Sequence, residues 1–154
     1  MDAEVYTDQR VAKLIAENFI PARLHVRDDA EAFVRFGERY NAQWTPTILM
    51  LDPAGTERHR IEGFLPTDDF LAQLQLGVAQ MSFKRGQFAD AERQFRAVVD
   101  AHGDSDAAAE AMYWAGVSRY KGTGDASALG ETARAFRERY QETPWAKKAS
   151  VWGG

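Results

Sequence analysis

The sequence contains no cysteine among its 154 residues. A chain without thiols forms no disulfide, offers no thiolate nucleophile and supplies no cysteine ligand to a metal. Thiol–disulfide exchange starts with the attack of a thiolate, so this chain cannot perform that chemistry by itself. The absence says little about compartment, because a protein without cysteine is indifferent to the redox state around it.

Long apolar runs and tracts of a single charge are missing as well. No run approaches the roughly 20 apolar residues needed to span a bilayer, and the start, Met1 to Glu4, is acidic and polar, unlike a signal peptide. The formal charge is −4, and basic and acidic residues alternate, whereas nucleic-acid binding depends on clustered basic residues. We therefore expect no membrane or nucleic-acid partner and a cytoplasmic location for the chain as written. A secretory signal upstream of Met1 stays an open alternative.

The first half of the chain mixes helical and strand patterns. Thr7 or Asp8 can cap a first helix, and an acidic pair at 28–29 opens a second. Polar and apolar residues alternate over 22–26, which predicts a strand with one polar face. The second helix is predicted to bury one stripe, made of Phe33, Phe36, Gly37 and Tyr40.

A hairpin is predicted after the second helix. Residues 47–51 are β-compatible and largely apolar, which favours a strand buried on both faces. Residues 52–55, Asp-Pro-Ala-Gly, form a turn sequence, because proline presets φ and glycine accepts a positive φ. Residues 58–61 then form the returning strand, which ends at Gly63.

From about Phe70 onward the pattern is helical throughout, with turns at 86–87, 102–105 and 122–125. Two short stretches, beginning at Leu76 and Ala115, are similar at a spacing of 39 residues, which is typical of helix-pair repeats. The predicted apolar stripes are Phe70, Leu71, Leu74, Val78 and Met81; Phe88, Ala91, Phe95 and Val98; Ala108, Ala111, Met112, Ala115 and Tyr120; and Leu129, Ala133, Phe136 and Tyr140.

The element order of the first half resembles the thioredoxin fold after its active-site helix. The most specific part is Trp44-Thr45-Pro46-Thr47, followed by the apolar strand and the hairpin. The acidic and aromatic start at 1–6 also resembles the segment that follows the CxxC motif in part of that family. The resemblance implies a cis Thr45–Pro46 bond, with Thr45 and Pro46 contacting an extended substrate peptide.

The sequence departs from that family at its start, because the first core strand and the CxxC motif are absent. We expect either a chain that begins inside a larger domain or a degenerate relative. In the complete fold the missing strand separates 22–26 from 47–51, so three outcomes are open. The two strands pair directly, a second copy supplies a strand and makes a homodimer, or the first half stays partly ordered. Closure or dimerisation is favoured because the apolar stripes are strong.

The helical half resembles tetratricopeptide repeats, with the second unit fitting less well than the first. The matching positions are Leu76, Gly77, Gly86, Ala91 and Phe95, then Gly116, Tyr120, Gly124 and Phe136. The expected fold class is α/β: an incomplete thioredoxin-like segment at residues 1–75, then an all-α tetratricopeptide-like tail of helical hairpins at 70–154. The two share the helix that begins near Asp68.

No pattern predicts a catalytic residue, a metal site or a cofactor. His25, His59 and His102 are far apart in sequence, and capping explains the acidic pairs at helix starts. One predicted helix carries Tyr113, Trp114 and Tyr120, and not all three of these side chains can face inward. They either pack in the repeat core or form an aromatic contact surface for a partner protein.

Two functions are favoured on the sequence, ahead of a small-molecule enzyme. One is a redox-inactive protein-binding or adaptor module, which binds other proteins or extended peptides along the Pro46 edge and the repeat surface. The other is a protein-disulfide oxidoreductase of the thioredoxin family whose CxxC lies upstream of Met1. Whether the protein is an enzyme is therefore left open, and the sequence names no client or pathway.

Overall fold

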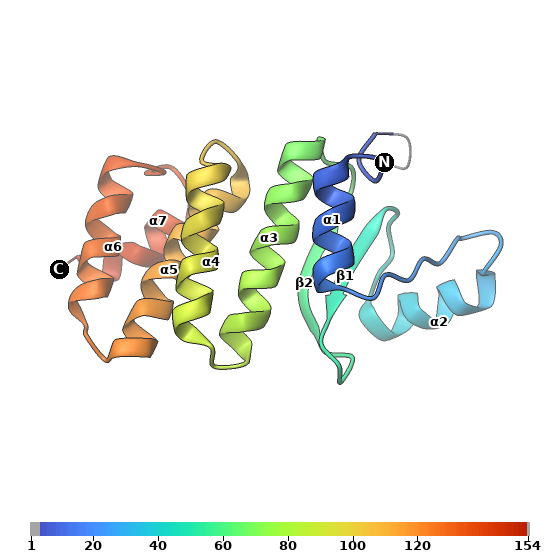
Figure 1. Ribbon diagram of the computed structural model, residues 1–154, viewed down its shortest axis with the longest axis horizontal. Helices are drawn as coiled ribbons and strands as arrows, with labels where there is room; N and C mark the ends of the chain where they lie inside the picture. The colour runs from blue at the N-terminus through green and yellow to red at the C-terminus, as the bar shows by residue number, and fades with distance from the viewer. Residues whose placement is uncertain (1–3, 154) are drawn as a thin grey trace. The chain divides into compact units, whose positions relative to one another are not determined.

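The structure is a computed structural model that describes residues 4–153. The chain divides into two compact units, Met1–Thr67 and Asp68–Gly154, and each is described by itself. The first unit contains two helices and a β-hairpin, and the second is entirely helical (Figure 1). None of the helices in the described part is both long and apolar enough to cross a bilayer.

In the first unit, α1 (Gln9–Asn18) begins where the sequence predicts. Asp8 is its N-cap, and the carboxylate accepts hydrogen bonds from the backbone N–H and the guanidinium of Arg10 at 2.8 and 2.9 Å. These contacts hold the pKa of Asp8 at about 2. Val11 is the buried residue of the helix, and Val5 ahead of it is also fully buried.

The hairpin consists of β1 (Thr47–Leu51) and β2 (Glu57–Glu62), paired antiparallel with Ile48 opposite Ile61. Asp52 closes the turn by accepting hydrogen bonds from the N–H groups of Ala54 and Thr56, both at 2.9 Å. Gly55 takes the positive φ, 78°, that the turn requires. The predicted hairpin is therefore confirmed.

The prediction that β1 is buried on both faces is wrong, because Met50 alone among its residues is buried. A strand is covered on both faces only inside a larger sheet with layers on either side. In the described part of the chain the sheet has only the two strands of this hairpin.

The predicted strand at 22–26 is also wrong. These residues pair with no strand, and the segment that joins α1 to α2 runs as an irregular loop (Figure 1). Its apolar residues Leu24 and Val26 are 38% and 48% exposed. A strand needs a neighbour to satisfy its backbone groups, and β1 does not take that place. The expected direct closure of the sheet is therefore not seen, and homodimerisation stays a prediction.

Helix α2 (Ala30–Tyr40) forms as predicted, with Asp29 as its N-cap residue. Its apolar stripe, however, is not buried: no residue of α2 is buried, and Phe36 is 38% exposed. A helix buries its stripe only where another layer covers it. A two-stranded hairpin offers too little surface to cover α2 in this way.

The second unit is a series of helices that follow one another in sequence and in space (Figure 1). They are α3 (Thr67–Lys84), which starts at the boundary between the units, α4 (Phe88–Ala101), α5 (Asp106–Thr123), α6 (Ser127–Glu138), α7 (Pro144–Ala149) and the 3-10 helix η1 (Ser150–Trp152). Gly86 and Gly124 end α3 and α5 with positive φ angles of 77° and 73°. The helical character predicted after Phe70 is confirmed, whereas α7 and η1 were not predicted.

The core of the second unit is built from small residues around a few large ones. Phe95 and Leu76 are fully buried, and alanines of α3, α4 and α5 surround them. Small side chains allow the helices to approach closely. The predicted stripes of α4 and α5 supply much of this core, although Tyr120 is 37% exposed.

Candidate functional site

The loop that enters β1 carries the most specific motif of the sequence, and its first residues are exposed. Trp44 is 68% exposed, Thr45 is exposed, and Pro46 is half-buried. The Thr45–Pro46 bond is cis, which confirms that expectation from the resemblance. Two hydrogen bonds fix the loop onto the hairpin: Thr47 Oγ1 donates to the Trp44 carbonyl at 2.6 Å, and Gly63 N–H donates to the Pro46 carbonyl at 2.8 Å.

The hairpin leaves one row of backbone groups unpaired beside this loop. Because Gly63 N–H reaches the Pro46 carbonyl while Thr47 lies opposite Glu62, the N–H and C=O groups of Thr47 and Leu49 point away from β2. No described residue hydrogen-bonds to them or to the Thr45 backbone. The unpaired backbone groups of Thr45, Thr47 and Leu49 are called the open edge below. Such an edge accepts an added strand.

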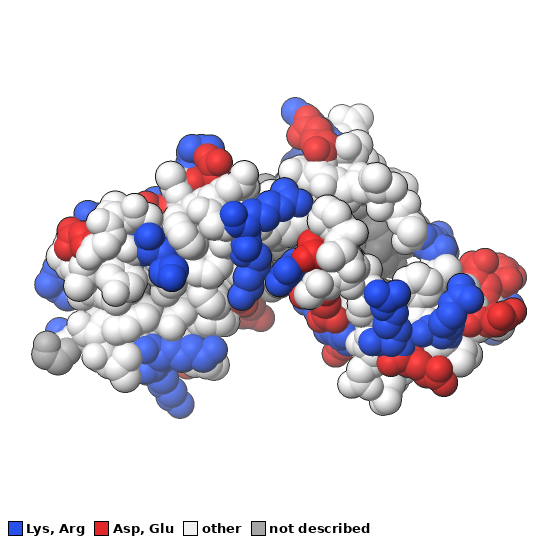
Figure 2. All heavy atoms as spheres, turned by 90° about the horizontal axis from the view of Figure 1, so that it is seen from below, with Lys and Arg blue, Asp and Glu red and all other residues white. Residues whose placement is uncertain are grey.

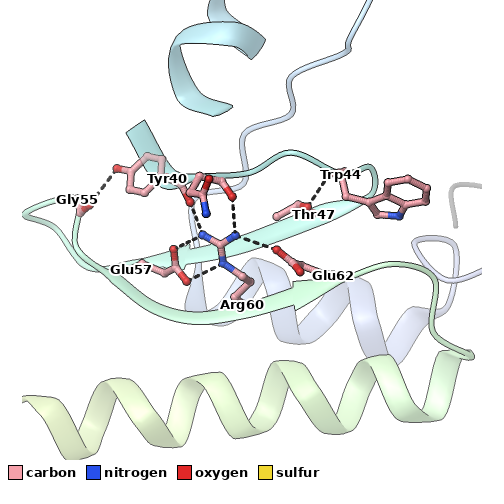
Figure 3. Close-up of polar contacts among 8 residues, drawn as sticks. Tyr40, Trp44, Thr47, Gly55, Glu57, Arg60 and Glu62 are labelled. Atoms are coloured by element: carbon pink, nitrogen blue, oxygen red, sulfur yellow. Dashed lines mark hydrogen bonds and ion pairs between the residues drawn. The ribbon is translucent and has the colours of Figure 1, made fainter. Parts of the chain in front are cut away.

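Arg60 of β2 ties the preceding helix to the hairpin (Figure 3). Its guanidinium donates to Glu57 at 2.7 and 2.8 Å, to Glu62 at 2.9 Å and to the carbonyls of Tyr40 and Asn41. Those carbonyls belong to the C-terminal end of α2, where helical partners run out. Arg60 therefore positions the start of the loop that carries Trp44.

The charges of this cluster reinforce one another. Hydrogen bonds from Arg60 hold the pKa of Glu57 below its usual range, and Glu57 and Glu62 raise the pKa of Arg60. The Arg60 side chain is 24% exposed, so the ion pairs are shielded in part from solvent. On the other side of the turn, backbone and Arg58 hydrogen bonds lower the pKa of Asp52.

A tyrosine hydroxyl makes a second link between helix and hairpin. Tyr40 Oη donates to the Gly55 carbonyl at 2.9 Å, which joins the last turn of α2 to the hairpin turn (Figure 3). A Cβ at Gly55 would lie 3.4 Å from Tyr40 Oη and 3.2 Å from the Arg39 guanidinium. Glycine at 55 thus serves both the positive φ and this contact.

The other predicted site residues, Tyr113 and Trp114, lie in the second unit. Both are half-buried in a cluster of rings. Trp114 packs on Phe83 and Trp145 with ring centroids 5.1 and 6.4 Å apart, and Tyr113 stacks on Trp152 at 4.8 Å. The cluster joins α3, α5, α7 and η1, so these aromatics help to hold the helices together while leaving part of each ring accessible.

In residues 4–153 no three His, Cys, Asp or Glu side chains are grouped to hold a metal ion. His25 lies in the loop before α2 and pairs with Asp28 at 2.9 Å. On the face drawn in Figure 2, basic, acidic and uncharged residues are interspersed, and neither sign forms a continuous face.

A family model described as a thioredoxin-like domain matches residues 1–77. The match covers half of the chain, and the protein therefore belongs to this family of thioredoxin-like domains. No family model matches the helical second half, so its tetratricopeptide character stays a prediction. Searches of curated proteins and of solved structures return no match.

Two features of the site were missed by reasoning from sequence. Trp44 belongs to the motif that ends in Pro46 and Thr47, but the motif alone does not show that its side chain is exposed. The role of Arg60 was also missed, although acidic residues stand on both sides of it in the sequence. Residues two apart lie on one face of a strand, so the pair of Arg60 with Glu62 could have been expected. The pair with Glu57, three residues away, could not be expected from this spacing.

Proposed function

We propose that this protein is a non-catalytic protein-binding module that takes an extended peptide along the open edge. One observation carries the proposal: the unpaired backbone groups of Thr45, Thr47 and Leu49 follow directly in the chain after Trp44, which is 68% exposed. Added strands obtain affinity from main-chain hydrogen bonds and specificity from alternate side-chain contacts. A rigid exposed tryptophan is well suited to supply such a contact.

Binding of a peptide at the open edge is expected to depend on Trp44. A peptide selected by phage display on the full chain should bind Trp44→Ala about tenfold or more weakly, since loss of a central aromatic contact costs roughly 2 kcal/mol. Fluorescence anisotropy of the labelled peptide measures the change. Ile20→Ala is the matched control, because Ile20 is 99% exposed in the same unit and lies outside the site.

The peptide itself provides a second control. N-methylation at alternate residues removes the donors that would pair with the open edge, whereas methylation at the intervening residues leaves them in place. Only one of the two methylated series should lose affinity. Equal binding by both series, together with full binding by Trp44→Ala, would show that the peptide binds elsewhere.

The alternative function is favoured by membership of the thioredoxin-like family. In a protein-disulfide oxidoreductase the same loop would contact the substrate, while a dithiol supplied from outside this sequence would perform the exchange. The residues Thr45 and Pro46 would then keep their binding role. The present sequence offers no sulfur nucleophile for the reaction.

The purified chain is expected to show no dithiol-driven reduction of insulin above the buffer rate, because attack on a disulfide requires a thiolate. Turbidity of the released insulin B chain measures the reaction, and a CxxC-containing thioredoxin serves as the positive control. Reduction above buffer by the cysteine-free chain would contradict the non-catalytic assignment.

A further inference from the structure

A half-buried carboxylate in the second unit lacks the partners that its position demands. Glu110 of α5 forms no ion pair within the described part of the chain. Its hydrogen bond comes from Gln80 Nε2 of α3 at 3.5 Å, the outer limit of such contacts. Desolvation raises the pKa of Glu110. Polar groups that are shielded from water normally have hydrogen-bond partners, so such a weak contact to a half-buried carboxylate calls for an explanation.

The aromatic residues beside Glu110 do not complete its hydrogen bonding. Trp114 lies one turn further along α5, and its indole N–H approaches the Glu110 carboxylate and so opposes the rise in the pKa of Glu110. The buried Nε1–H nevertheless lacks a partner with hydrogen-bond geometry. Tyr113 also lies on this side of α5, with its ring 5.4 Å from that of Trp114. The carboxylate thus lies beside the Trp114 indole, and Gln80 is the one donor in the described part of the chain that reaches it with hydrogen-bond geometry.

The basic residue that acts on Glu110, Lys148, is directed at a ring. The positive charge of Lys148 of α7 also opposes the rise in the pKa of Glu110, but Lys148 makes no ion pair with it. Its Nζ lies over the Trp145 ring, 3.9 Å from the centroid. The arrangement shows that these rings accept a cation, and that the cation present leaves Glu110 unpaired.

We propose that Glu110 and the rings of Tyr113, Trp114 and Trp145 form a binding site for an arginine side chain of a partner protein. A guanidinium can pair with a carboxylate through two parallel hydrogen bonds while its plane stacks on aromatic rings. It would supply the donors that Glu110 lacks. Lys148 competes with the incoming arginine, because its ammonium already lies over the Trp145 ring and adds positive charge to the site.

The site deepens the proposed protein-binding function and rests on it for the identity of a partner, but its residues are separate from the open edge. It can therefore be tested with a small probe that has no strand to add. The probe is N-acetyl-arginine N-methylamide, with the uncharged citrulline analogue as its control. The four tryptophans provide separate indole N–H signals in a nitrogen-15 NMR spectrum.

The arginine probe should shift the indole signals of Trp114 and Trp145 in a saturable manner, and the citrulline analogue should bind about tenfold more weakly. Trp44, in the other unit, should not respond. Glu110→Gln should weaken arginine binding about tenfold, whereas Lys148→Ala should strengthen it several-fold. Glu142→Gln removes one exposed negative charge of the same unit and is expected to leave binding unchanged.

The opposite signs expected for Glu110→Gln and Lys148→Ala separate this site from general loss of structure. Equal binding of arginine and citrulline by the wild-type chain would overturn the proposal without any variant. So would unchanged binding in Glu110→Gln, or a Lys148→Ala variant that binds no more tightly. If Trp44→Ala leaves peptide binding intact while the arginine site behaves as stated, the open-edge function fails and this site stands.

Discussion

Gly116→Ala is expected to lower the free energy of unfolding of the second unit by about 2 kcal/mol, because it overpacks the contact between α5 and α6. A Cβ at position 116 would lie 2.0 Å from Thr132 Oγ1 and 2.8 Å from Thr132 Cβ. Thr132 is 8% exposed, and its hydroxyl donates to the Ala128 carbonyl at 2.7 Å. The threonine therefore cannot rotate away without giving up that hydrogen bond.

The control for this change is another helical glycine. A Cβ at Gly130 would find its closest neighbour, the Trp152 carbonyl, at an ordinary 3.8 Å. Gly130→Ala should therefore gain up to about 1 kcal/mol from the higher helix propensity of alanine. Denaturant unfolding followed by helical circular dichroism measures both. A Gly116→Ala variant as stable as the wild type would contradict the close packing of these helices.

Arg60→Met is expected to destabilise the first unit by about 2 kcal/mol, because it removes a charged donor shared by several acceptors. The methionine keeps the apolar stem but leaves Glu57, Glu62 and the carbonyls of Tyr40 and Asn41 without this donor. The end of α2 then loses its anchor on the hairpin. The loop that carries Trp44 should lose its fixed position.

The Arg60 variant should also weaken binding of the selected peptide although Trp44 and the open edge are unchanged. Arg35→Met is the matched control, since Arg35 is an exposed residue of α2 and takes no part in the Arg60 cluster. Unfolding curves and anisotropy titrations measure the two effects. Full stability and full binding in Arg60→Met would refute the positioning role assigned to Arg60.

The sequence was most informative where local chemistry decides the structure. The cap at Asp8, the turn at Asp52 and Gly55, and the helix ends at Gly86 and Gly124 all lie where their residue types predict. These features depend on a few neighbouring residues. For the same reason, the hairpin and the helical second half were predicted with nearly correct boundaries.

Reasoning from sequence failed where a structure depends on distant parts of the chain. The alternation at 22–26 is a valid strand pattern, but no neighbouring strand pairs with it. The stripe of α2 is equally valid, but no layer covers it. The pattern of one segment shows what it can bury or pair, and it does not show whether a partner is in place.

The candidate sites follow the same rule. Thr45 and Pro46 were found because they belong to a local motif, and Tyr113 and Trp114 because aromatic residues stand out in a helix. Their surroundings were not predictable, because the contacts of Trp114 with Phe83 and Trp145 join helices that are far apart in sequence. The sequence shows Glu110 only as an acidic residue in a helix, because its weak hydrogen bond comes from Gln80 of another helix.

The central claim, that a peptide binds along the open edge without thiol chemistry, is tested most directly by NMR mapping of the selected peptide on the wild-type chain. The account predicts shifts in the Trp44 indole signal and in the backbone amides of Thr45, Thr47 and Leu49, with slowed exchange of the Thr47 and Leu49 amides. Shifts confined to residues 68–154, with these amides unchanged, would contradict it.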